Sequence, residues 1–79
     1  MPMEQKLYKI LSDLFNIKEN EADNASMKNV KKWDSLKHIE LIMSIEEEFE
    51  VPKIGPDEIV KMTSVSQIKD VLRKKGIQI

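Results

Sequence analysis

A carboxylate, a hydroxyl and an imidazole stand close together near the middle of the chain, as Asp34, Ser35 and His38. Such residues form the nucleophile, base and orienting acid of many hydrolases. Ser35 and His38 are three residues apart, which permits contact on a helix. Asp34, however, would sit elsewhere on the turn, and the chain has no nucleophile-elbow sequence. We therefore disfavour hydrolysis, and we predict that the chain is not an enzyme and has no catalytic residue.

Other reactive side chains are few. The chain has no cysteine, which excludes a disulfide framework, a thiolate metal site and a thiol nucleophile. His38 is the one histidine, and the acidic residues do not have the spacing of a calcium loop. We predict no metal site. Because His38 falls among apolar positions of its predicted helix, we expect it to be partly buried and hydrogen-bonded.

Ser35 stands where a helix is predicted to begin. This helix runs from about Ser35 to Glu50, and either Asp34 or Ser35 can cap its first amides. The pair Val51-Pro52 ends it, because proline disfavours the helical conformation at the residue before it. One side of the helix has the apolar spacing of a face that packs against a core, formed by Leu41, Ile42, Ile45 and Phe49.

The opposite side of this helix is mixed, with two apolar residues framed by carboxylates. We call it the acidic face, and it consists of Leu36, Glu40, Met43, Glu47 and Glu50. A small apolar anchor inside a charged rim is typical of a protein-docking surface. Single exposed apolar residues are also ordinary, and glutamate is a good helix former. The pattern alone leaves both interpretations open.

The segments before this helix predict one helix and one long loop. Apolar residues with helical spacing predict a first helix, with Pro2 in its first turn; they are Met3, Leu7, Ile10, Leu11, Leu14 and Phe15. Residues 16–34 show no clear periodicity and predict a long loop, which is usually functional in so small a protein. We expect Met27, Val30 and Trp33 to fasten this loop to the core.

Two more helices are predicted after Pro52. The run Pro56-Asp57-Glu58 opens a short helix over about residues 56–61, and Ser64-Val65-Ser66-Gln67 has the pattern of a capping box. Gly76 can end the last helix, whose apolar side consists of Val65, Ile68, Val71 and Leu72. No strand pattern is present. We predict an all-α fold, a small four-helix bundle with three longer helices, one short helix and a long first loop.

The length and the charge pattern narrow the function further. Seventy-nine residues make one domain, 1–79, and 41% apolar with 34% charged residues is typical of a soluble globular chain. Residues 34–50 contain six acids and one lysine, although the whole chain has a net charge of only −1. This acidic segment would repel phosphates, so we expect no nucleic-acid partner. We also expect no membrane insertion and a cytoplasmic location, because no long apolar run or signal peptide is present. We expect the chain to be a monomer.

The stretch from Trp33 to Phe49 resembles the acyl carrier proteins and related phosphopantetheine-binding carrier domains. The residues that carry the resemblance are Asp34-Ser35-Leu36 at the start of a helix and Glu46-Glu47-Glu48-Phe49 at its end. The likeness covers essentially the whole chain, since it includes the first helix, the long loop, Pro56-Asp57-Glu58 and Thr63-Ser64-Val65. It therefore implies the carrier fold as well as the carrier motif.

This resemblance implies that Ser35 accepts a 4′-phosphopantetheine arm from a phosphopantetheinyl transferase, with Asp34 and Leu36 beside it in the cofactor site. The arm would supply the thiol that the chain lacks and would hold an acyl or aminoacyl group as a thioester. Its further partners would be the enzymes that load and transfer this group. The positive end of the helix would favour the phosphodiester by about 0.3–1 kcal/mol.

Two departures from the family pattern lie around Ser35. Lys31-Lys32-Trp33 replaces the Gly-Ala type of pair that many fatty-acid carriers have before Asp-Ser, and Lys37 follows the leucine. They favour a carrier of a specialised pathway over the housekeeping carrier of fatty-acid synthesis, while the cargo and the pathway stay open. The alternative function is an unmodified helical interaction domain that docks through the acidic face.

Overall fold

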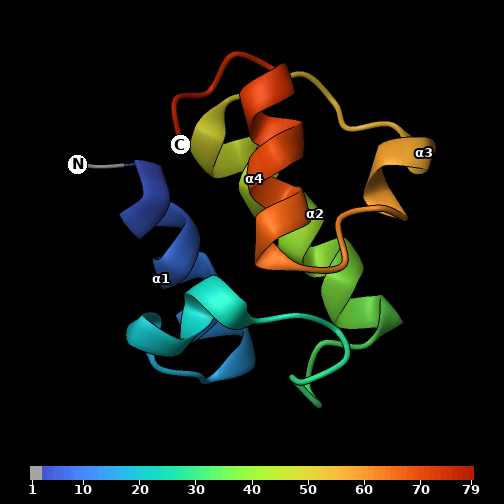
Figure 1. Ribbon diagram of the computed structural model, residues 1–79. Helices are drawn as coiled ribbons and strands as arrows, with labels where there is room; N and C mark the ends of the chain where they lie inside the picture. Colours follow the sequence, from blue (N-terminus) through green and yellow to red (C-terminus); the bar gives the residue numbers. More distant parts are fainter. Residues whose placement is uncertain (1–2) are drawn as a thin grey trace.

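The computed structural model describes residues 3–79, and every element in this range is helical (Figure 1). The elements are α1 (Met3–Phe15), the 3-10 helix η1 (Glu19–Asn24), α2 (Ser35–Phe49), α3 (Pro56–Ile59) and α4 (Val65–Lys74). Within the described range the only β pairing is an isolated bridge between Ser26 and Ser64. The predicted all-α fold is confirmed, while the predicted place of Pro2 lies outside the described residues.

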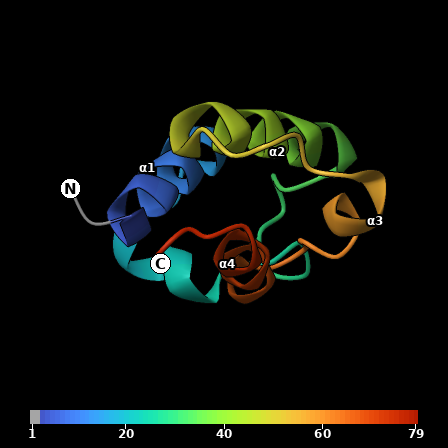
Figure 2. The same ribbon diagram turned by 90° about the horizontal axis from the view of Figure 1, so that it is seen from above.

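The core forms where the apolar sides of α1, α2 and α4 meet. Seen from above in Figure 2, α4 lies across the core from α2, and α1 adjoins α2. The short helix α3 lies beside the N-terminal end of α2. The predicted stripes are the buried ones, and η1 packs against both α1 and α4. The most deeply buried large side chains include Leu7, Leu11, Phe15, Trp33, Leu41, Ile45, Ile68 and Leu72.

The helix ends follow local chemistry. The last helix ends at Lys74, and Gly76 terminates it, as predicted, with a backbone φ of 92° that favours glycine. The amides of Gly76 and Ile77 donate to the carbonyls of Arg73 and Leu72, at 3.1 and 3.0 Å, which is the Schellman arrangement. At the end of α2, Glu50 adopts a left-handed conformation with a φ of 52° and follows the helix rather than extending it.

The segment 16–34 is more ordered than predicted, because it contains η1. Ala22 and Ala25 are buried, at 0% and 3% exposure, and their spacing of three residues suits a 3-10 helix. The prediction of an unstructured loop was wrong here because a helix of this kind is too short to show a periodic pattern. As expected, Trp33 is buried and Met27 and Val30 pack partly against the core.

Two further details differ from the predictions. The short helix α3 ends at Ile59 rather than near residue 61, because Lys61 and Met62 donate to the third residue back in a tightening turn. Ser64 caps α4 by accepting from the Gln67 amide at 3.3 Å. The reciprocal half of the capping box does not form, because Gln67 Oε1 instead accepts from the hydroxyls of Thr63 and Ser64.

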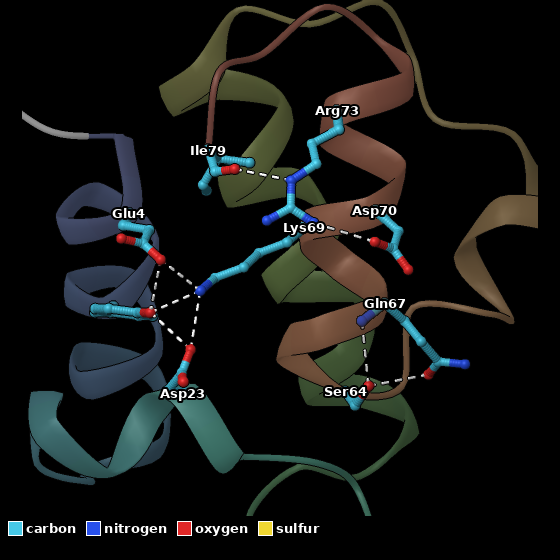
Figure 3. Close-up of polar contacts among 9 residues, drawn as sticks. Glu4, Asp23, Ser64, Gln67, Lys69, Asp70, Arg73 and Ile79 are labelled. Atoms are coloured by element: carbon cyan, nitrogen blue, oxygen red, sulfur yellow. Dashed lines mark hydrogen bonds and ion pairs between the residues drawn. The ribbon is translucent and has the colours of Figure 1, made fainter.

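A charged cluster ties α4 to α1 and η1, and nothing in the sequence pattern predicted it. In Figure 3 the side chain of Lys69 extends from α4 toward Glu4 of α1 and Asp23 of η1. Its Nζ donates to Glu4 Oε2 at 2.7 Å, to Asp23 Oδ1 at 2.9 Å and to the Tyr8 hydroxyl at 2.7 Å. Burial by itself would lower the pKa of Lys69, but the hydrogen bonds to Glu4, Tyr8 and Asp23 outweigh it and raise that pKa well above its usual value.

Candidate functional site

The first turn of α2 presents Ser35 to solvent, and its neighbour Asp34 does the capping. Asp34 has an extended backbone, and its Oδ1 accepts from the Lys37 amide at 2.9 Å. Its carbonyl accepts from the His38 amide at 2.8 Å. The sequence left Asp34 and Ser35 as alternative caps, and the structure selects Asp34. The hydroxyl of Ser35, at the first helical position, therefore has no capping role and lies on an exposed residue.

Directly before this turn, Trp33 connects the end of the long loop to the core. Only 2% of Trp33 is exposed, and its ring stacks on Phe15 with ring centroids 5.0 Å apart. Trp33 Nε1 donates to His38 Nδ1 at 3.0 Å, and His38 Nε2 lies 2.7 Å from the carbonyl oxygen of Ile59. We call this chain of two hydrogen bonds the Trp33–His38–Ile59 link.

The link defines the state of the imidazole. Because the indole N–H can only donate, His38 Nδ1 must accept, and Nε2 must then carry the proton that it donates to Ile59. His38 is thus a neutral residue that joins the loop end, α2 and α3. It is hydrogen-bonded, as predicted, and more deeply buried than expected, at 7% exposure. The link restrains the first turn of α2 from two sides.

The same geometry bears on the serine–histidine hypothesis. Both ring nitrogens of His38 are engaged with Trp33 and Ile59, and His38 is buried while Ser35 is exposed. His38 therefore has no nitrogen free to take a proton from Ser35, which removes the base that a hydrolytic mechanism would need.

The acidic face is exposed as predicted from the helical spacing. Leu36 is 72% exposed and Met43 is 61% exposed, and the side chains of all three glutamates also reach solvent. Glu40 forms an ion pair with Lys37 at 3.3 Å, so its charge is partly offset. Glu50 needs a correction: because it lies beyond the end of α2 in a left-handed conformation, helical geometry does not align it with Leu36 and Met43.

Two exposed apolar residues were missed. Ile39 is 48% exposed and lies three residues after Leu36 and four before Met43, so helical spacing alone would have placed it on this side. Val60 is 69% exposed after the end of α3, and no spacing rule predicts this. One acid of the segment has a different role: Glu46 Oε2 accepts from the Ile54 amide at 2.7 Å and holds the connection between α2 and α3.

Neither metal-binding nor membrane-spanning features stand out in the part of the chain that the structure describes. Residues 3–79 contain no group of three or more potential ligands that could hold a metal ion. Over the same residues, no helix combines the length and the apolar character needed to cross a membrane.

Comparison with known proteins then decides the family. A scan against models of protein families finds no match. The chain is 39% identical over 75 residues to the acyl carrier protein of Buchnera aphidicola subsp. Schizaphis graminum. The aligned stretch covers 94% of each of the two chains. It is 34% identical over 77 residues to the acyl carrier proteins of two strains of Buchnera aphidicola subsp. Acyrthosiphon pisum, covering 96% of this chain and 95% of theirs.

The chain belongs to the acyl carrier protein family. The similarity spans nearly the full length of each of these acyl carrier proteins, so it includes α1 and α4 as well as the segment around Ser35. In an acyl carrier protein, a residue that accepts the carrier group must be reachable by other proteins. The start of α2 satisfies this condition, since Asp34, Ser35 and Leu36 are all exposed.

Proposed function

We propose that this acyl carrier protein holds acyl or aminoacyl groups as thioesters on a 4′-phosphopantetheine arm attached to Ser35. It would act as a single carrier domain, 1–79, that moves these groups between enzymes of a fatty-acid or specialised biosynthetic pathway. The observation that supports this most is the position of Ser35: an exposed hydroxyl at the first residue of α2, released from capping by Asp34.

The residues around Ser35 suit the attachment of such an arm. The hydroxyl would become the ester oxygen of a phosphodiester, and the positive end of α2 favours the negative charge placed there. When bound, the arm supplies a terminal thiol, a group that the cysteine-free chain itself lacks. Asp34 keeps the helix start formed through its bond to the Lys37 amide, so it would present Ser35 in one orientation.

The acidic face is the proposed docking surface for the transferase and for the enzymes that load and transfer the cargo. Leu36 and Met43 offer exposed apolar anchors, and Glu40 and Glu47 would attract lysine and arginine side chains of the partner. Ile39 enlarges the apolar part of this surface. The ion pair between Lys37 and Glu40 weakens the field near Ser35 and would disfavour enzymes adapted to more acidic carriers.

The carrier itself would catalyse no reaction, because its exposed serine has no base in His38. We further infer a monomeric, cytoplasmic protein without nucleic-acid partners or membrane insertion. The acidic charge of residues 34–50, directly at the proposed docking surface, supports the absence of nucleic-acid partners.

Intact-mass spectrometry tests the attachment site. The purified chain is incubated with coenzyme A and a phosphopantetheinyl transferase of broad specificity, and we expect one arm per chain. Ser35→Ala should take up none, while Ser44→Ala, which changes a serine on the same helix, should be modified like the parent. An arm on Ser12, Ser26, Ser44, Ser64 or Ser66 would overturn the assignment.

A charge-reversal experiment tests the docking surface. The double variant Glu40→Lys/Glu47→Lys should slow arm transfer at low salt, and added salt should narrow the difference because it screens the summed field. The matched control is Glu19→Lys/Asp70→Lys, which changes the net charge by the same amount. Each double variant breaks one i,i+3 ion pair, that of Glu40 with Lys37 in the first and that of Asp70 with Arg73 in the control. Equal rates for the parent and the first variant at low salt would show that the acidic face is only a solvated surface.

The second candidate function is an unmodified helical interaction domain that docks through the acidic face. The exposure of Leu36 and Met43 favours this function, because a partner could bind these side chains whether or not Ser35 is modified. The intact-mass experiment distinguishes the two functions, since the interaction domain gains no mass with any transferase.

A further inference from the structure

The interior nearest to Ser35 is bounded by a small number of groups. The first turns of α2 are flanked by the loop that ends at Trp33 and by α3, whose last residue, Ile59, accepts from His38. A group carried on Ser35 could reach the core at this end only between α2 and these two segments. The arrangement at this boundary therefore determines whether cargo can enter the bundle.

The Trp33–His38–Ile59 link closes this boundary. Trp33 is 2% exposed and His38 is 7% exposed, and their rings stack with centroids 6.1 Å apart. On its other side Trp33 stacks on Phe15, which is 1% exposed. An apolar chain that entered here would have to displace the indole or part α2 from α3. Either movement would leave the buried indole N–H or the partly buried Ile59 carbonyl without its partner, which is unfavourable.

Hollows elsewhere on the surface offer an apolar chain little shelter. A hollow of about 550 Å³ at the start of α4 is lined by one apolar residue, Met27, and by five residues with polar or charged groups, Ser26, Lys28, Thr63, Ser64 and Gln67. Another of about 290 Å³ between α1 and α2 is lined by three carboxylates, Asp13, Glu47 and Glu48, together with Ile10, Leu14 and Ser44. An extended hydrocarbon in either place would lie against charged or hydroxyl groups.

We infer that this carrier keeps its cargo outside the helical bundle, and that it is adapted to acyl groups with little apolar surface, either short or substituted with polar groups. Trp33 and His38 are then specificity-determining residues, since they close the interior to long hydrocarbon chains. The inference rests on the proposed attachment of the arm to Ser35. It adds the class of cargo, which the sequence left open.

A series of loaded carriers tests the inference. The full chain is loaded at Ser35 with acetyl-, butanoyl-, octanoyl- and dodecanoyl-phosphopantetheine from the corresponding coenzyme A thioesters. Its thermal midpoint should stay constant along the series to within about 1 °C, because no added methylene is buried. Retention on a hydrophobic-interaction column should rise with chain length, because the chain is exposed. The emission of Trp33, the only tryptophan, should not change along the series.

Two variants show whether the link is responsible. Trp33→Leu leaves space beside Phe15, so its thermal midpoint should rise with chain length while column retention rises less than in the parent. His38→Leu removes both hydrogen bonds but keeps Trp33 as a fluorescent reporter, whose emission should shift when octanoyl is loaded. His38→Leu also serves if Trp33→Leu does not fold, as judged by circular dichroism.

The outcomes separate this inference from the proposed function. A parent chain that accepts no arm on Ser35 overturns both. A parent chain that accepts the arm but whose thermal midpoint rises by several degrees from acetyl to dodecanoyl overturns the inference alone. A folded variant that behaves like the parent in every readout overturns the assignment of that residue.

Discussion

Two polar clusters fasten the same segment, residues 16–34, and they do so by different physical means. The first, which we call the Lys69 cluster, consists of Lys69, Glu4, Tyr8 and Asp23. It holds Asp23, near the end of η1, through an ion pair with Lys69. The Trp33–His38–Ile59 link holds the other end, just before Ser35, through neutral hydrogen bonds. The side chains of Glu4 and Asp23 are 49% and 64% exposed, whereas Trp33 and His38 are almost fully buried.

This difference shows where the chain can tolerate the loss of a contact. Carboxylates at a solvent edge can be hydrated again once their partner is removed. Buried neutral groups cannot, so the loss of one partner leaves the other unsatisfied. The segment is therefore held more loosely at η1 and more firmly beside Ser35. Removal of the buried indole should have the larger effect, and the following predictions test that order.

The largest effect is expected for Trp33→Ala, which removes a buried ring that packs on Phe15. It should lower the free energy of unfolding by about 3–5 kcal/mol. Urea denaturation followed by circular dichroism measures this, since the variant has no tryptophan. The control Trp33→Phe retains a ring but leaves His38 Nδ1 without its donor, and should cost about 1–3 kcal/mol. A loss below about 1 kcal/mol for Trp33→Ala would contradict the comparison.

At the other cluster, Lys69→Met should lower the free energy of unfolding by about 1–3 kcal/mol. The buried stem of the lysine is replaced by an apolar chain of similar shape, and the carboxylates left behind can be hydrated. Urea denaturation near pH 7 provides the measurement. Lys74→Met, which changes an exposed lysine on the same helix, should alter the stability by less than about 0.5 kcal/mol. A larger cost for Lys69→Met than for Trp33→Ala would reverse the comparison.

Acid should remove the contribution of the Lys69 cluster. The hydrogen bond with Lys69 lowers the pKa of Glu4 and, together with the bond to Tyr8, that of Asp23. Depressed carboxyl pKa values add stability that is complete above the ordinary values of 4.5 and 3.8 and is lost as the pH falls through the lower folded-state values.

The parent and Lys69→Met should therefore differ in stability near pH 7 and converge as the pH falls toward about 2. Thermal or urea unfolding at a series of pH values measures this convergence. Lys74→Met supplies the control, because it leaves the contacts among Glu4, Asp23 and Lys69 in place. A gap between the parent and Lys69→Met that is independent of pH would show that the ion pairs contribute nothing.

The smallest effects are expected at the proposed attachment site. Asp34→Ala removes the bond to the Lys37 amide and should cost about 0.5–2 kcal/mol. Ser35→Ala removes a hydroxyl that has no capping role, and should change the free energy of unfolding by less than about 0.5 kcal/mol. Chemical denaturation of both variants tests this pair. If Ser35→Ala is the more destabilising, Ser35 contributes to the helix start and Asp34 is not its main cap.

Much of the candidate site could be predicted because its geometry is local. Helical spacing separated Leu41 and Phe49, which are buried, from Leu36 and Met43, which are exposed. The same rule failed at Glu50, because the helix ends one residue earlier and a left-handed residue no longer follows helical spacing. It also missed η1, which is short, buries only Ala22 within its bounds and produces no extended pattern.

The sequence by itself determined the places of the four α-helices and of Ser35 at the start of α2, because capping and periodicity depend on residues within about four positions of each other. Only the tertiary structure decided which groups meet across the bundle. Lys69 binds Glu4 from 65 residues away, and His38 binds the Ile59 carbonyl across 21 residues. Such partners are selected by the packing of whole helices, and no local pattern in the chain specifies them. For this reason the place of Ser35 at the start of α2 could be predicted from the sequence, whereas the contacts of His38 with Trp33 and Ile59 could not.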